Sequence, residues 1–468
     1  MEVITTRRTA LLGVGASLFG APAYARVRHV AQVIVIGAGL SGLETALRLE
    51  AAGIEVQVVE ASNRIGGRLH TLYDLPGQPN AGGVQIGSSY KRLHARARAL
   101  GVELFPEPTS GRATVLNIGG QMIASRDWGA SQANSFPAAY KNTPPSAALF
   151  ATTAGEHNPL KTFDDWRGEK GIGSDVSADA YLARFGFDAP SRRLIDVGLN
   201  GNRLDTYSIV NTMRSAALFG AERVSGGVSS MVRGGSQRLP EAMARALKKP
   251  VMMGQAVTRM STNAQGVSVM LANRTRLTAQ AIVASTPFPT LARISIRAPL
   301  SRETRDAIVG LPYTQIKQIF LEPEKRYWET DGLPIDMWTD GPLERVFSVR
   351  DSASQDTGLL CVWLNGTGAT GFDVAGIGAQ MSALRPASEG KFKLRHVQDW
   401  TSTNPLAGGA YMHWAPGQIA RWAGKMGAPA GRLFFAGEHL GLVHTGMEAA
   451  FESAEQAAED VLAALGTL

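Results

Sequence analysis

The segment 32–60 constrains the fold of this chain more than any other part of its sequence. Gln32–Ile36 is an apolar, β-branched run typical of a buried parallel strand. The glycine-rich turn Gly37–Gly42 follows and leads into a helical pattern. A second apolar strand, Glu55–Val59, is closed by the acidic Glu60. This order of strand, GxGxxG turn, helix, strand and acid predicts a dinucleotide-binding βαβ unit.

Each part of this unit has a physical task. Gly37 makes the tight turn, Gly39 lets the backbone approach a pyrophosphate, and Gly42 lets the helix and the strand pack closely. The helix N-terminus directs free N–H groups at the phosphates, and Glu60 is placed to accept from ribose hydroxyls. We therefore expect Gly37, Gly39, Gly42 and Glu60 to bind the cofactor.

The segment after Glu60 favours FAD over NAD. Paired glycines, Gly66 and Gly67, stand beside Arg68, which would place a fixed cation near a phosphate. This stretch resembles the GG motif of two-dinucleotide-binding-domain flavoproteins, which hold an extended FAD. The predicted cofactor is therefore FAD, and Gly66, Gly67 and Arg68 are expected to contact it.

The C-terminal part of the chain returns to the same predicted site. A short apolar strand ends in Gly437-Glu438, and a helix opens at Gly446-Met447. The Glu438 carboxylate could bind ribityl hydroxyls, and the N–H groups near Met447 could face the flavin ring. A terminal strand and helix that only close the sheet remain an alternative for this segment.

Elements typical of an FAD domain recur in three parts of the chain, and two other parts separate them. The predicted FAD-binding domain consists of residues 30–100, 228–295 and 425–468. The intervening segments, 101–227 and 296–424, are expected to form a substrate-binding domain. The predicted fold class is α/β, with a two-dinucleotide-binding-domain FAD (Rossmann-like) domain interleaved with an α+β substrate-binding domain.

Composition excludes several other classes of protein. Glycine contributes 52 of 468 residues without a collagen period, which fits tight turns and close backbone approach to a ligand. The net charge is modest, 47 − 40 = +7, and no basic stripe predicts nucleic-acid binding. Cys361 is the single cysteine, so neither an internal disulfide nor a cysteine-rich metal site is expected. No metal ligand set is predicted.

Residues 1–25 have the pattern of an export signal. Arg7-Arg8 precedes an apolar stretch that is too short to span a bilayer, and Ala23-Tyr24-Ala25 is an A-x-A cleavage pattern. The paired arginines resemble a twin-arginine signal, so we expect a periplasmic protein with no stable membrane insertion. An ordinary secretory signal and a cytoplasmic arm are the alternatives.

The whole chain after this segment resembles the flavin amine oxidase family of monoamine, polyamine and L-amino-acid oxidases. The residues that carry the resemblance occur in the family's order: Val33–Gly42, Glu60–Arg68, Gly82-Gly83, Gly234–Gln237, Leu311–Trp328, Gly408–Gln418 and Phe434–Ala450. The resemblance implies further cofactor contacts from Gly83, Val84, Gln85, Val257, Gly437, Glu438 and Met447.

The resemblance also implies roles at the reaction site. Lys317 matches the family lysine that hydrogen-bonds a water at flavin N5, and Tyr411 matches one tyrosine of the aromatic cage. The opposite cage tyrosine falls near Gly446, so His444 or Trp414 is a candidate to fill that space. Packing or surface roles remain open for each of these two residues.

Two departures from the family pattern affect the expected chemistry. Ala410 stands where monoamine oxidases have a cysteine bonded to the flavin, so noncovalent FAD is expected. Gln85 stands where many L-amino-acid oxidases have an arginine for the substrate carboxylate, which a glutamine cannot replace. Gln85 therefore favours amines without a carboxylate, although another arginine of the substrate domain could substitute.

The function implied by this resemblance is FAD-dependent oxidation of a primary or secondary amine to an imine. Molecular oxygen or a periplasmic electron carrier would reoxidise the flavin. An L-amino-acid oxidase is the alternative enzyme, and a non-catalytic flavin-binding electron-transfer or assembly protein is the alternative from another class. The sequence leaves the particular amine and the oligomeric state open.

Overall fold

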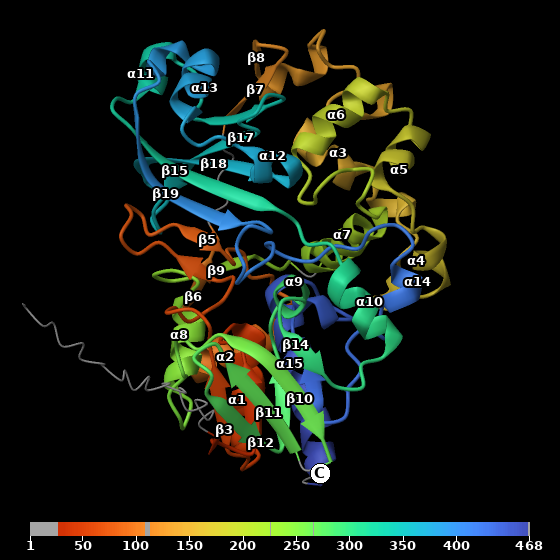
Figure 1. Ribbon diagram of the computed structural model, residues 1–468. Coiled ribbons are helices and arrows are strands. Elements are labelled where there is room, and N and C mark those ends of the chain that lie inside the picture. The colour runs from red at the N-terminus through yellow and green to blue at the C-terminus, as the bar shows by residue number, and fades with distance from the viewer. Residues whose placement is uncertain (1–26, 108–112, 225, 265, 467–468) are drawn as a thin grey trace, which may run out of the picture.

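A computed structural model describes residues 27–107, 113–224, 226–264 and 266–466 of the chain (Figure 1). The predicted export signal at residues 1–25 lies outside the described residues and stays a prediction. Within the described residues, no helix is both long enough and apolar enough to cross a bilayer.

A parallel four-stranded sheet forms the centre of one lobe. Its strand order is β20 (Leu433–Phe435), β13 (Ala281–Ala284), β2 (Val33–Ile36) and β3 (Val56–Val59). All three strand pairs are parallel, and β2 and β3 pair in register from Val33↔Val56 to Ile36↔Val59. The sheet therefore takes its strands from all three segments that the sequence assigns to FAD binding.

Both faces of this sheet are covered, which explains why its strands are apolar on both sides. Val33 and Val35 pack in the cluster that includes helices α1 (Leu40–Ala51) and α15 (Gly446–Leu465). Ile34 and Ile36 pack in the cluster of a second sheet. That five-stranded sheet has the order β1 (Val27–His29), β12 (Arg276–Ala279), β11 (Gly266–Leu271), β10 (Val257–Asn263) and β14 (Ser295–Arg297). Burial on both faces is the rule for parallel sheets.

The other lobe contains a seven-stranded mixed sheet, in the upper half of Figure 1. Its strand order is β19 (Phe392–Trp400), β15 (Ile316–Pro323), β18 (Asp356–Asn365), β17 (Arg345–Arg350), β16 (Asp336–Thr339), β7 (Thr114–Ile118) and β8 (Gln121–Ala124). The helices of segments 101–227 and 296–424 are α3 (Pro145–Thr152), α4 (Glu169–Gly173), α5 (Ala178–Arg184), α6 (Ala189–Val197), α7 (Ile209–Val224), α10 (Arg302–Gly310), α11 (Tyr327–Asp331), α12 (Gly366–Gly371), α13 (Ile377–Leu384) and α14 (Ile419–Trp422).

Short elements connect the two lobes. Two small antiparallel pairs join β4 (His70–Thr71) to β5 (Asn80–Gly82) and β6 (Leu104–Pro106) to β9 (Ser230–Val232). The remaining helices are α2 (Lys91–Ala99), α8 (Arg238–Arg245) and α9 (Phe288–Leu291). The chain therefore crosses between the lobes several times, which is typical of an interleaved architecture.

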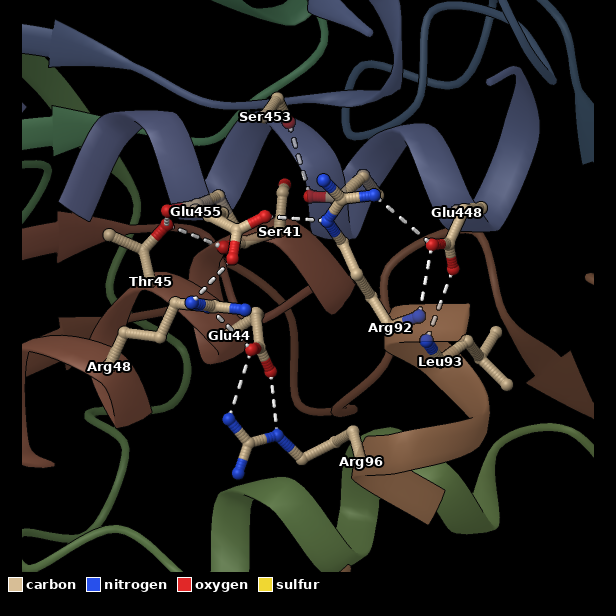
Figure 2. A network of polar contacts seen from close by, with 12 residues as sticks. Ser41, Glu44, Thr45, Arg48, Arg92, Leu93, Arg96, Glu448, Ser453 and Glu455 are labelled. Carbon is tan, nitrogen blue, oxygen red and sulfur yellow. Dashed lines mark hydrogen bonds and ion pairs between the residues drawn. The ribbon is translucent and has the colours of Figure 1, made fainter. Parts of the chain in front are cut away.

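Buried carboxylates connect α1, α2 and α15 (Figure 2). Glu44 on α1 is 2% exposed and accepts from Arg48 Nε at 2.8 Å and from Arg96 Nε at 2.7 Å. Glu448 on α15 accepts from the backbone N–H groups of Arg92 and Leu93 at 3.0 and 3.1 Å. Since α2 has no side-chain cap of its own, Glu448 caps its first turn from another helix. These contacts fix the two helices whose N-termini border the candidate site.

Candidate functional site

A cavity of about 570 Å³ runs from the glycine-rich turn after β2 to the segment around Tyr411. Of the residues expected to bind cofactor or substrate, those on its wall are Gly37, Gly39, Glu60, Gly66, Gly67, Arg68, Gly83, Val257, Tyr411, Glu438 and Met447. One continuous space therefore joins the dinucleotide-binding elements to the predicted amine-binding tyrosine.

The three glycines of the turn have different surroundings. Gly37 has a φ of 109°, a left-handed backbone that favours glycine. A Cβ on Gly42 would lie 2.1 Å from the carbonyl oxygen of Gly37, so Gly42 is required for packing inside the protein. A Cβ on Gly39 would meet no atom within 4 Å and would project into the cavity. The space at Gly39 therefore fits a ligand that approaches the backbone, as a pyrophosphate does.

Glu60 closes the adenosine end of the cavity. One carboxylate oxygen accepts from the backbone N–H of Ala38 at 2.7 Å, and the other accepts from that of Ser62 at 2.8 Å. These two bonds hold the side chain at the cavity wall, and each oxygen keeps a lone pair for a further donor. The geometry fits a carboxylate that binds ribose hydroxyls.

Arg68 and Glu438 form an ion pair across the cavity wall. The Arg68 guanidinium donates to Glu438 at 2.8 Å and to the carbonyl oxygen of Ala410 at 3.1 Å. Glu438 also accepts from the backbone N–H of Met412. Burial, the largest single influence, lowers the pKa of Arg68, but the charge and hydrogen bond of Glu438 together with nearby Tyr313 outweigh burial, and the net shift is upward. The pair thus links the segments that follow β3 and β20 to the segment that carries Tyr411.

Trp400, which sequence reasoning missed, forms part of the wall together with Tyr411. Its indole N–H donates to the Ala81 carbonyl oxygen at 2.6 Å, which fixes the ring. Trp400 and Tyr411 belong to one apolar cluster with Ile316 and Trp363. The position of Trp400 at the end of β19, which mixes apolar and charged residues, is the only local signal for it, and that signal does not specify where the side chain points.

The space opposite Tyr411 is not filled by either candidate from the sequence. Trp414 is buried against Trp166, with ring centroids 5.7 Å apart, and does not line the cavity. The His444 ring also lies outside the cavity wall, 6.3 Å from the ring of Tyr90. A Cβ on Gly446 would lie 3.8 Å from the Tyr90 hydroxyl, so Tyr90 is the aromatic side chain that approaches this glycine.

Lys317 does not line the cavity, because strand alternation places its side chain on the other face of the sheet. Its cross-strand neighbours on β15 are Leu364 and Asp399. The next residue, Gln318, pairs with Gln398, which does line the cavity. Gln318 is 2% exposed, and its Oε1 has no hydrogen-bond partner. Gln318 is therefore the polar side chain of this strand that shares a face with Gln398, and it lines a second hollow rather than the cavity itself.

Four predicted cofactor contacts lie away from the cavity wall. Val84 lines a second hollow of about 580 Å³, together with Gln318, Phe347 and Trp363. Gln85 is exposed and donates to both carboxylate oxygens of Glu107 at 2.9 Å. Gly42 and Gly437 serve packing, since a Cβ on Gly437 would lie 2.3 Å from the His439 ring.

Buried histidines near the site are held neutral. Burial and the neighbouring Arg68 lower the pKa of His439 to about 3, and burial with the neighbouring Arg64 lowers that of His70 to about 4. His70 lines the cavity and bonds through Nδ1 to Gln398 Oε1 at 2.7 Å. Neither imidazole therefore adds a positive charge to the site at neutral pH.

Comparisons with known proteins agree with this arrangement. A family model described as flavin containing amine oxidoreductase matches residues 40–462. L-amino-acid oxidases from Echis ocellatus and Siganus canaliculatus are each 25% identical to this chain, cover 92% of it, and are themselves covered over 88% and 85% of their lengths.

Two solved structures share the fold, each with a TM-score of 0.74 and 21% identity. One is putrescine oxidase bound to putrescine, with 93% of this chain and 100% of that chain covered. The other is cyclohexylamine oxidase from Brevibacterium oxydans IH-35A, with 93% and 99% covered. Since the family model spans nearly the whole described chain, this protein belongs to the family of flavin-containing amine oxidoreductases.

Proposed function

We propose that this chain is an FAD-dependent enzyme that oxidises a primary or secondary amine to an imine, which hydrolyses to an aldehyde or a ketone. The observation that carries the proposal is the continuous cavity that joins Gly39 and Glu60 to Tyr411 and Trp400. Bound FAD would supply a two-electron acceptor for the hydride at its N5 atom. Glu60 would hold the ribose end, and the N-terminus of α15 at Met447 would lie at the flavin end.

The residues at the flavin end suit a neutral amine. Tyr411 and Trp400 offer aromatic faces, and burial raises the pKa of Tyr411, so its hydroxyl stays protonated. His70 adds no positive charge, because its lowered pKa keeps the imidazole neutral at neutral pH. These side chains bind and orient an uncharged nitrogen and exclude water, and no acid–base pair is needed for hydride loss.

We also propose that the flavin is held without a covalent bond. Ala410, on the cavity wall, offers no nucleophile. The single cysteine, Cys361, lines the second hollow rather than the cavity, and burial raises the pKa of its thiol to about 12. A thiol with so high a pKa is a poor nucleophile for flavin attachment.

The test uses the purified protein with its flavin. We expect a yellow protein that loses its flavin to the supernatant on acid precipitation. Anaerobic addition of an amine panel is expected to bleach the flavin absorbance. A colourless protein that does not bind added FAD would contradict the cofactor assignment. A yellow protein that no amine or amino acid bleaches would instead favour an electron-transfer or assembly protein.

Gln318 and Lys317 give a matched pair of variants on one strand. Gln318→Leu is expected to slow turnover about tenfold, because it removes a buried amide that can hold a water or a substrate group on the cavity side. Lys317→Met is expected to leave turnover within about twofold, since its side chain lies on the other face. Stopped-flow measurement of flavin reduction and reoxidation checks both variants.

The opposite result would restore the role that the resemblance implies for Lys317. If Lys317→Met slows reoxidation more than tenfold while Gln318→Leu does not, the lysine reaches the flavin in the working enzyme. A loss of stability without a kinetic effect in Gln318→Leu would give Gln318 a packing role only.

The final electron acceptor is proposed to be molecular oxygen or a periplasmic carrier. The periplasmic carrier is proposed because residues 1–25, which contain the adjacent arginines Arg7 and Arg8, are predicted to be an export signal. The rate of reoxidation by oxygen in the same stopped-flow experiment separates an oxidase from a dehydrogenase.

A further inference from the structure

One row of side chains crosses the seven-stranded sheet on the side of the cavity. The register places Gln398 opposite Gln318, Gln318 opposite Trp363, Trp363 opposite Arg345, and Arg345 opposite Trp338. Because residues in register point to the same face, the arginine lies on the same face as Gln398, which lines the cavity. Arg345 therefore shares a face of the sheet with Gln398, and it lies outside the walls of both the cavity and the second hollow.

Arg345 is short of hydrogen-bond partners. Its guanidinium lies 5.6 Å from the centre of the Trp363 ring, and within the described part of the chain its side-chain hydrogen bonds run only to Asn200 Oδ1, at 3.4 and 3.5 Å. Its Nε is buried without a partner, and it forms no ion pair within 4 Å among the residues that the structure describes. Burial lowers the pKa of the guanidinium, but an arginine stays charged.

Another buried arginine of this chain, Arg385, has both an aromatic and a carboxylate partner. Arg385 lies over the Tyr327 ring at 4.9 Å and also donates to both carboxylate oxygens of Asp331, at 2.7 Å each. Arg345 has the aromatic contact but lacks the carboxylate. A buried guanidinium without its anion is costly, so its retention calls for a partner that arrives from outside.

The acid beside Arg345 is engaged elsewhere. Glu344 accepts from the backbone N–H of Asn365 at 2.7 Å, and burial raises its pKa to about 7. It is therefore only partly charged at neutral pH and forms no ion pair with Arg345 within 4 Å. Glu344 weakens the positive field at Arg345 without occupying its donors.

Arg345 also lies next to the predicted amine site. The Tyr411 hydroxyl donates to the backbone carbonyl oxygen of Asn200 at 3.4 Å, and Arg345 reaches the side chain of the same residue. Arg345 and Tyr411 are close enough for the charge of one to act on the other. The free donors thus lie beside the side chain that is expected to hold the amine.

We propose that Arg345 binds an anionic group of the substrate, so that the enzyme prefers amines that carry a carboxylate over diamines. This inference rests on the proposed amine oxidation and narrows its substrate class. The planar guanidinium offers paired donors that match a carboxylate, whereas its charge repels a second ammonium group. Gln85, where the family resemblance would place such an arginine, is exposed and bonded to Glu107, so the anion site has moved to another element.

Arg350 is the rival cation for this role. It lines the second hollow and its Nε is also buried without a partner. It lies five residues further along β17, about 17 Å away at the rise of a strand, and pairs in register with Asp356. Its distance from Tyr411 favours Arg345 as the site that a short amino acid can reach.

The experiment compares two substrates that differ only by a carboxylate, L-phenylalanine and 2-phenylethylamine. In Arg345→Met, the kcat/KM ratio of L-phenylalanine to 2-phenylethylamine is expected to fall about 100-fold, mainly through KM for the amino acid. Arg345→Lys should recover part of the preference. Benzoate, a carboxylate without an amine, should perturb the flavin absorbance of the wild type and bind at least tenfold more weakly to Arg345→Met.

Matched variants decide between the arginines. Arg326→Met removes another arginine that lies over a tryptophan, Trp328, and is expected to change neither measurement. Arg350→Met is expected to leave the preference between the two substrates as it is. If Arg350→Met abolishes the preference instead, or if Arg345→Met lowers both substrates equally, the proposal is overturned.

The failure of this inference can be told apart from failure of the proposed function. A wild-type enzyme whose flavin is bleached by amines but not by carboxylated amines, and which does not bind benzoate, contradicts only the role of Arg345. A flavin that no amine of either kind reduces contradicts the amine oxidation itself.

Discussion

Gly42→Ala is expected to yield protein with less than about a tenth of the wild-type flavin content, because the new methyl group has no room. Its Cβ would lie 2.1 Å from the Gly37 carbonyl oxygen and 2.4 Å from Ser285 Oγ. The first of these atoms is backbone and cannot rotate away. Relief requires α1 to move off β2, which displaces the helix N-terminus from the phosphate site. The flavin-to-protein absorbance ratio and the melting temperature measure the effect.

Gly39→Ala is the matched control, since it adds the same methyl group to the same turn. Gly39 has a φ of −82°, which alanine adopts freely, and its Cβ would meet no protein atom within 4 Å. The apoprotein should therefore keep its stability within about 1 kcal/mol, while the dissociation constant for FAD rises at least tenfold. If both variants lose stability equally, or if Gly39→Ala binds FAD normally, the cavity beside Gly39 does not receive the pyrophosphate.

The sequence predicted the dinucleotide half of the site well because that half is local. Gly37, Gly39 and Glu60 all come from one strand–turn–helix–strand unit, in which the turn and the following acid are fixed by short-range geometry. The continuous apolar runs and the 3.6-residue apolar period locate its strands and its helix. The contacts of such a unit therefore follow from residue spacing alone.

The substrate half could not be predicted in this way, because it depends on strand register and on distant partners. A shift of one residue along a strand moves a side chain to the other face of the sheet. Lys317 and its neighbour Gln318 therefore lie on opposite faces. Arg345 has no sequence signal at all, since what marks it is a buried Nε without a hydrogen-bond partner. Tyr90 approaches Gly446 from a segment more than three hundred residues away. Only the assembled structure brings these residues together.

Glu44→Ala is expected to lower the free energy of unfolding by about 3 kcal/mol, because it removes one partner from a buried ion network. Glu44 contacts Arg48 and Arg96, and Arg48 also bonds to Glu455 on α15 at 2.9 Å (Figure 2). Without Glu44, Arg96 loses the only ion pair that the described residues give it. A fall of about 3 °C in the melting temperature corresponds to this loss for a chain of this length.

An exposed ion pair serves as the control for that measurement. Arg203 and Asp205 bond at 3.1 Å with side chains 54% and 56% exposed, so Asp205→Ala should cost no more than about 1 kcal/mol. Because Glu44 holds α1 to α2 and, through Arg48 and Glu455, to α15, and the N-termini of α1 and α15 border the cavity, excess FAD should recover part of the stability lost in Glu44→Ala. A variant that melts like the wild type with and without FAD would mean that packing alone positions the two helices. Recovery by FAD would instead show that the network organises the cofactor site, so that cofactor binding and helix packing stabilise the same arrangement.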